Sequence, residues 1–148
     1  AILHPGYYGQ IERVANTKIA IQAFFDNPLL GTGMGSFSEL SAQFSGIERM
    51  MYPHNILLEL ASETGISGLL FFLFMLCASF KKLLMLKRKY RNTPYFPLIN
   101  LVFGLLVFTF LTSLTGGNIH NPLLFVWFGT VFILESLISK SKTSLSEN

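Results

Sequence analysis

The chain has 148 residues, of which 51% are hydrophobic and only 13% are charged. This composition is too apolar for a soluble domain of the same size, so it predicts an integral membrane protein. The formal net charge of +3 does not indicate nucleic-acid binding, because residues 1–63 carry −3 and the basic excess lies in two short clusters beside apolar segments.

The first predicted element is an amphipathic helix. Apolar residues recur at a helical period between residues 11 and 24, and Pro28 ends the pattern. The following stretch, "NPLLGTGMGSF", is rich in glycine and is typical of a turn. We therefore expect the chain to reverse direction after this helix.

Two helix-start signals come next. Ser36 and Glu39 have the spacing of a capping box, which predicts a short helix over residues 37–44. Asn55 is a good N-cap for a longer helix that leads into an apolar run. The segment before the first apolar run is therefore expected to be helical rather than irregular.

Three apolar runs can cross a bilayer, which takes about 20 residues of helix. They cover roughly residues 66–80, 96–115 and 123–138. The first is short, but a helix that begins near Asn55 would complete it, and Gly65 or Gly68 could break that helix. The predicted fold is all-α, with three transmembrane helices preceded by a helical segment.

Basic residues set the predicted orientation. They lie in residues 81–94, between the first two spans, and again after the third span, so both regions should face the cytoplasm. Residues 1–62 then form a helical loop on the outer side that carries the candidate site. Residues 63–138 form the transmembrane segment, and residues 139–148 a cytoplasmic tail that we expect to be disordered.

His54 is the sharpest candidate for chemistry. Histidine titrates near neutrality as a residue type, so it can accept a proton there. Pro53 restricts the backbone and Asn55 starts a helix, so the ring should be held rigidly near the membrane surface. The alternative is a turn histidine that only covers the start of the helix.

Three further features suit an anionic ligand. Arg13 and Arg49 are guanidiniums of the outer segment and fit phosphate oxygens, although contact with lipid headgroups or a neighbouring carboxylate is the alternative. Gly33, Gly35 and Ser36 could offer backbone amides and a helix N-terminus to an anion. No phosphate-loop lysine follows these glycines, so a plain turn is the competing interpretation.

Metal and cofactor sites are not expected. The three histidines show no i, i+4 pairing and have no carboxylate at ligand spacing. Cys77 is the only cysteine and lies inside an apolar run, so it can form no intrachain disulfide. We therefore predict that the chain uses no cofactor and no metal.

Arg13, then "DNPLLGTGMGSF", then "PHNILLELASETGISG" and a helix hairpin together resemble the C-terminal portion of the O-antigen ligase and O-antigen polymerase family of bacterial envelope enzymes. The similarity rests on motifs over residues 9–80, and on topology alone for the last two spans. It implies that the chain is a fragment of a larger multi-spanning glycosyltransferase and is inactive by itself.

The resemblance implies an inverting, metal-independent enzyme of the bacterial inner membrane. Such an enzyme takes a glycan from an undecaprenyl-diphosphate carrier and passes it to lipid A core or to a growing polysaccharide. By position, Arg13 matches the arginine thought to hold the diphosphate, and His54 matches the histidine thought to help deprotonate the acceptor. Residues 1–62 would then be periplasmic, in contact with membrane lipids and not with nucleic acid.

Two alternatives remain open at this point. Within the family, the chain could belong to a polymerase rather than a ligase, because both use the same donor and leaving group. Outside it, the chain could be part of a non-catalytic membrane transporter or envelope scaffold, in which His54 and Arg13 only bind headgroups.

Overall fold

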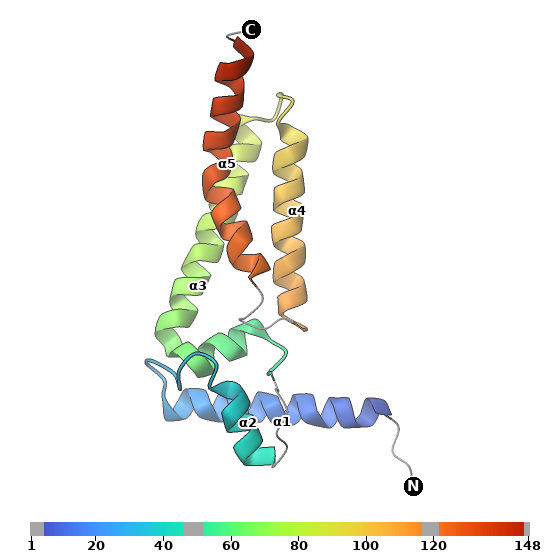
Figure 1. Ribbon diagram of the computed structural model, residues 1–148, viewed down its shortest axis with the longest axis vertical. Helices are drawn as coiled ribbons and strands as arrows, with labels where there is room; N and C mark the ends of the chain where they lie inside the picture. Colours follow the sequence, from blue (N-terminus) through green and yellow to red (C-terminus); the bar gives the residue numbers. More distant parts are fainter. Residues whose placement is uncertain (1–4, 46–51, 117–121, 147–148) are drawn as a thin grey trace. The chain divides into compact units, whose positions relative to one another are not determined.

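The computed structural model describes residues 5–45, 52–116 and 122–146, and within these ranges it contains helices and no strand. The all-α prediction is therefore confirmed. In chain order the helices are α1 (Pro5–Asp26), α2 (Phe37–Ser45), α3 (Ile56–Lys89), α4 (Phe96–Ser113) and α5 (Leu123–Ser146) (Figure 1).

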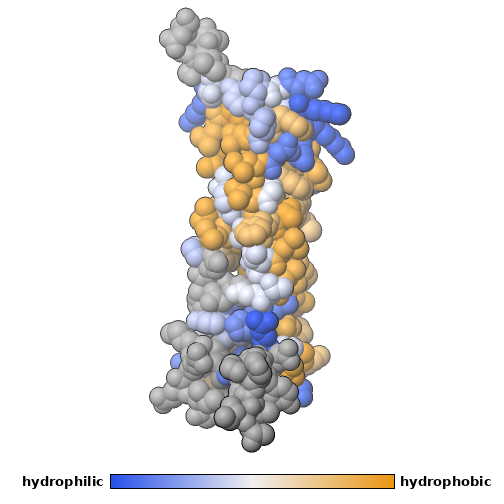
Figure 2. Space-filling model, turned by 90° about the vertical axis from the view of Figure 1, so that its right-hand side faces the viewer, coloured by the Kyte–Doolittle hydropathy of each residue, from blue (hydrophilic) through white to orange (hydrophobic). Residues whose placement is uncertain are grey.

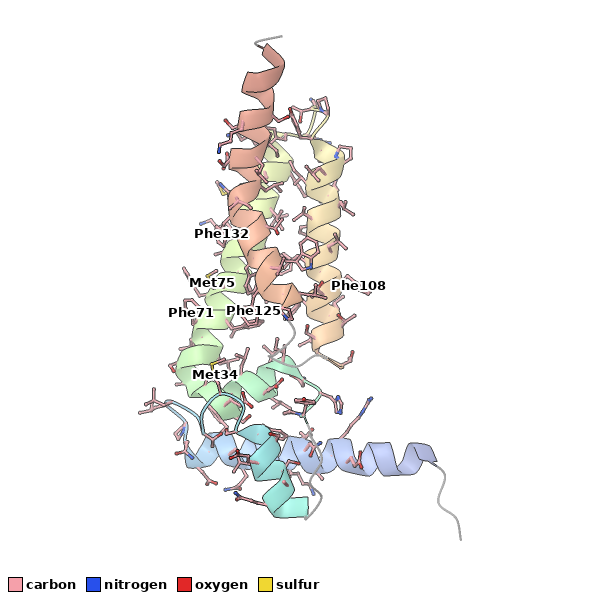
Figure 3. The ribbon with its side chains drawn as sticks, in the orientation of Figure 1. Met34, Phe71, Met75, Phe108, Phe125 and Phe132 are labelled. Atoms are coloured by element: carbon pink, nitrogen blue, oxygen red, sulfur yellow. The ribbon has the colours of Figure 1, made fainter. Side chains whose placement is uncertain are left out.

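The three predicted spans are also confirmed. Among the described residues, α3, α4 and α5 are long and apolar enough to cross a membrane. Large aromatic side chains on these helices are exposed, among them Phe108, Phe125 and Phe132, which Figure 3 labels. Exposed apolar area on this scale is unfavourable in water and favourable in lipid.

Contacts divide the chain into two compact units. The first unit comprises Ala1–Phe72 with Thr112–Asn121, and the second comprises Leu73–Leu111 with Pro122–Asn148. The early part of α3 belongs to the first unit and its remainder to the second. The predicted domain boundary at residue 62 thus falls inside a helix.

The second unit is held together by apolar packing and by charged groups near one end. Its buried core includes Leu83, Leu86, Ile99, Leu106 and Val131. Glu135 of α5 forms ion pairs with both Lys82 and Lys89 of α3, the latter at 2.7 Å. Figure 2 shows one apolar flank of this unit with hydrophilic residues gathered at the end where α3 finishes. Glu135 therefore has a structural partner in this unit.

Disorder was expected over residues 139–148, and the structure describes helix in this stretch as far as residue 146. α5 continues without interruption from Leu123 to Ser146. Residues 139–146 contain neither proline nor glycine, so nothing in this stretch stops a helix that has already formed.

In the first unit, the predicted helix boundaries hold closely. α1 ends two residues before Pro28, and α2 begins at Phe37, one residue after Ser36. The Asn55 side-chain oxygen accepts hydrogen bonds from the amides of Leu57 (3.0 Å) and Leu58 (3.3 Å), which confirms it as the N-cap of α3.

Candidate functional site

The site begins with a break in α3. Gly65 has φ 65° and ψ −163°, which no helical residue adopts, so the helix kinks there rather than at Gly68. A break at this position prevents the amides of Ile66 and Ser67 from bonding to the carbonyls four residues earlier, at Ser62 and Glu63. Four backbone groups beside the kink therefore need other partners.

Residues 27–36, which we call the glycine loop, supply all four partners. The loop approaches α3 backbone to backbone, and each helical bond lost at the kink is replaced by one to the loop. The four bonds run from Ile66 N to Pro28 O (2.8 Å), Ser67 N to Leu29 O (3.5 Å), Thr32 N to Ser62 O (2.9 Å) and Gly33 N to Glu63 O (2.9 Å).

Two glycines make this close approach possible. A Cβ atom at Gly31 would lie 2.3 Å from the carbonyl carbon of Glu63, and one at Gly65 would lie 2.5 Å from that of Leu29. Both glycines also have positive φ, at 69° and 65°. Only a residue without a side chain fits either position.

The Glu63 side chain then fixes the start of α2. Its carboxylate is 2% exposed and accepts hydrogen bonds from the amides of Gly35 (2.9 Å) and Phe37 (3.2 Å). A helix N-terminus favours a negative charge, and here the charge comes from the chain itself. Glu63 therefore takes the place at which an external anion was expected.

The predicted anion-binding groups of the glycine loop have internal partners. The Gly33 amide bonds to the Glu63 carbonyl, and the Gly35 amide bonds to its carboxylate. Ser36 occupies the N-cap position of α2, because its carbonyl accepts a hydrogen bond from the amide of Leu40 (3.1 Å), while its hydroxyl donates to Gly33 O at 2.6 Å and lies 2.6 Å from the Thr32 hydroxyl. Substrate binding by Gly33, Gly35 and Ser36 stays a prediction, while their role in shaping the loop is visible.

Asn16 connects the arginine helix to the residues around His54. Its side-chain amide donates to the carbonyl of Tyr52 at 3.2 Å, and its oxygen accepts a hydrogen bond from the Ser41 hydroxyl at 3.2 Å. Asn16 is 3% exposed and Ser41 is fully buried. One buried amide therefore links α1, α2 and the histidine segment, which we define as residues 52–55.

Sequence reasoning missed Asn16, although a signal was present. Asn16 lies at helical spacing from Ala20 and Ala23, the two small residues by which α1 is buried. A polar side chain on such a face needs a hydrogen-bond partner. That need could have identified Asn16 as a residue that connects two segments. It could not have shown which residue Asn16 contacts.

His54 has an unusual backbone. Its φ is 55°, and among the described residues it is the one non-glycine residue with positive φ. This conformation is unfavourable for a bulky side chain and, when it persists, is often found at functional sites. The ring is partly exposed, and no described group hydrogen-bonds to it. It is therefore held in position by its backbone and remains accessible to a ligand.

Arg13 lies on α1, one helical turn before Asn16, and its side chain is exposed. Arg13 and His54 are joined by one helical turn from Arg13 to Asn16, the bond from Asn16 to Tyr52, and two residues from Tyr52 to His54. Even with these two residues fully extended, the Cα atoms of Arg13 and His54 lie at most about 22 Å apart. Arg49, the other predicted arginine, lies outside the described residues. The structure thus connects the helix that bears Arg13 to the histidine segment through the buried contact of Asn16 with Tyr52.

No group of three or more histidine, cysteine, aspartate or glutamate side chains is placed to hold a metal ion within residues 5–45, 52–116 and 122–146. Several polar side chains of the first unit, Glu63 and Asn16 among them, instead hydrogen-bond to backbone amides and carbonyls. The catalytic roles of His54 and Arg13 stay predictions.

Residues 9–73 match the family model described as O-antigen ligase. The matched segment contains Arg13, the glycine loop, Glu63 and His54, so it includes the whole arrangement described above. No curated protein and no solved structure matches the chain. The resemblance seen in the sequence motifs is confirmed over this segment.

Proposed function

We propose that the chain belongs to the O-antigen ligase family, whose model matches residues 9–73, and that the protein transfers a glycan from an undecaprenyl-diphosphate carrier to lipid A core or to a growing polysaccharide. The match over residues 9–73 supports membrane-bound glycosyl transfer in polysaccharide biosynthesis. The carrier, the acceptor, the periplasmic side of the inner membrane and the residues involved are our proposal.

One observation carries the proposal: the buried Asn16 side chain bonds to the carbonyl of Tyr52, two residues before His54. This contact keeps the helix that bears Arg13 next to the histidine segment. A diphosphate-linked sugar could then touch the guanidinium at its phosphate end and the imidazole near its reacting carbon. Positioning of this kind lowers the entropic barrier to reaction.

Arg13 is assigned to the diphosphate. A guanidinium presents a planar set of donors that fits phosphate oxygens and stays charged at every physiological pH. Negative charge grows on the diphosphate as the bond to the sugar breaks, so a fixed cation nearby stabilises the transition state. Arg13 is exposed and can reach a ligand without disturbing the core.

His54 is assigned to the acceptor. A ring nitrogen takes the proton of the acceptor hydroxyl while its oxygen forms a bond to the anomeric carbon. The bond from that carbon to the diphosphate oxygen breaks, and its electron pair leaves with the carrier diphosphate. Attack from the face opposite the leaving group inverts the sugar linkage, and no step requires a metal ion. General-base assistance of this kind is worth roughly 10² to 10⁴ in rate.

The test is the surface polysaccharide made by cells whose full-length protein carries His54→Ala. We expect normal amounts of protein in the membrane and loss of glycan attachment or of chain length. Loss of all lipid-A-attached glycan would identify a ligase, and attachment of a single repeat unit would identify a polymerase. An unchanged profile at normal protein level would instead support a transporter or scaffold. Gln22→Ala, at an exposed position of α1, is the matched control.

Arg13→Lys tests the assigned contact with the diphosphate. If the guanidinium holds the phosphates through several directed hydrogen bonds, lysine cannot replace it and transfer falls. If the position only attracts headgroups by its charge, lysine restores function. Lys18→Ala removes a nearby charge from α1 and should leave transfer unchanged.

A further inference from the structure

The glycine loop turns its polar backbone inward and its large apolar side chains outward. Leu29, Leu30 and Met34 are 70%, 78% and 73% exposed. Their backbone neighbours, by contrast, are bound to the break in α3. Three large apolar side chains on one short loop form a surface that is costly to keep in water. Something apolar is therefore expected to cover it.

The place where the loop is attached indicates what covers it. α3 has no charged residue between Gly65 and Lys81, and a denser basic group begins at Lys87. At about 1.5 Å per residue, Gly65 lies roughly 24 Å along the helix from Lys81 and roughly 33 Å from Lys87. These lengths bracket the roughly 30 Å hydrocarbon core of a bilayer. The uncharged stretch is therefore long enough to cross a bilayer, and Gly65 marks the end of it that is opposite the basic residues in the sequence.

The loop is tied to this end of the uncharged stretch by short hydrogen bonds. The carbonyl of Pro28 accepts a bond from Ile66, the first residue of the uncharged stretch, at 2.8 Å. The exposed surface continues on α3 one turn further, where Leu70 is 57% and Phe71 is 65% exposed. In Figure 3, Met34 and Phe71 lie on the same flank in that view. The loop is thus attached where the uncharged stretch of α3 begins.

We propose that the glycine loop inserts Leu29, Leu30 and Met34 among the phospholipid acyl chains at the edge of the hydrocarbon core. Phe25, at the end of α1, is another exposed apolar side chain of this unit, at 70%. Insertion fixes the depth of the first unit in the membrane. The loop is hydrogen-bonded to α3, and Glu63 of α3 binds the amides at the start of α2, so the three segments keep one depth. The proposal concerns membrane contact and does not depend on the transfer reaction.

The test measures the depth of a fluorescent label on single cysteines. Leu30→Cys is made in the full-length protein with all other cysteines, Cys77 included, replaced by alanine, and the labelled protein is reconstituted in phosphatidylcholine vesicles with brominated acyl chains. Glu39→Cys, exposed on α2, is the aqueous reference, and a variant that retains only Cys77, exposed within the apolar run of α3, is the reference for the span.

We expect bromines near the headgroup end of the acyl chains to quench the label at position 30 severalfold more than the label at position 39. Deep bromines should quench the label at Cys77 better than the label at position 30. A label at position 30 that aqueous iodide quenches as strongly as the one at position 39 overturns the proposal. A label protected from both quenchers also overturns it, because protein would then cover the loop. Met34→Cys, a second exposed position, provides an independent reading.

Discussion

The most specific structural prediction concerns the close contact between the glycine loop and the break in α3. Gly31→Ala places a methyl group 2.3 Å from the carbonyl carbon of Glu63 and 2.5 Å from the amide nitrogen of Thr64. Both are backbone atoms and cannot rotate away. Gly35 offers a matched control, because its φ of 81° is also positive but nothing lies within 4 Å of its Cβ position.

Both variants strain a left-handed backbone, but only Gly31→Ala also creates a steric clash. Either alanine should cost about 1–2 kcal/mol for its left-handed backbone. At Gly31 the clash must also move the loop out of the break, which loses up to four hydrogen bonds at about 1 kcal/mol each. Gly31→Ala should therefore weaken the loop contact by about 4 kcal/mol more than Gly35→Ala.

Amide hydrogen exchange measures this difference directly. The amides of Thr32, Gly33 and Ile66 are protected by the contact and exchange only when it opens. Since about 1.4 kcal/mol corresponds to a factor of ten, Gly35→Ala should speed exchange about tenfold and Gly31→Ala about a thousandfold beyond that. Equal acceleration by the two variants would refute the account of the loop contact.

Three further predictions follow from buried or paired polar groups. Asn16→Ala should lower glycan transfer by releasing α1 from the histidine segment. Ser41→Ala, which removes the bond to Asn16 but leaves the bond from Asn16 to Tyr52, should lower it less; a transfer assay on membranes compares the two variants. Glu63→Gln should destabilise the start of α2 by about 1–3 kcal/mol, read from amide exchange there. Lys82→Ala should destabilise the second unit more than Lys89→Ala, because their side chains are 28% and 59% exposed; detergent-induced unfolding followed by tryptophan fluorescence tests this.

Features set by neighbouring residues could be predicted from the sequence. The Asn55 cap bonds to amides two and three residues away, and Pro28 acts on the residues just before it. The three spans follow from runs of apolar residues, which need no knowledge of distant contacts. The position of the break was narrowed to Gly65 or Gly68, and only the contact with the glycine loop distinguishes the two.

Features set by distant residues could not be predicted. The Glu63 carboxylate binds amides 28 and 26 residues earlier in the chain, and Asn16 bonds to a carbonyl 36 residues later. Local periodicity contains no information about such pairs, so the loop was interpreted as a possible site for an external anion. Asn16 was overlooked for the same reason, because its partner is far away in the sequence. Arg13 and His54 were noticed because their side chains have recognisable chemistry.

The central claim is that His54 acts as a base and is not merely a turn residue, and a rate comparison tests it most directly. Asparagine and glycine both tolerate the φ of 55° found at this position, so His54→Asn and His54→Gly should keep the backbone intact while removing the base. The measurement is the rate of glycan transfer from an undecaprenyl-diphosphate donor by membranes containing the full-length protein. We expect both variants to lose roughly 10² to 10⁴ in rate with unchanged amide protection in α3. Transfer within a few-fold of the unaltered protein by either variant would contradict the account.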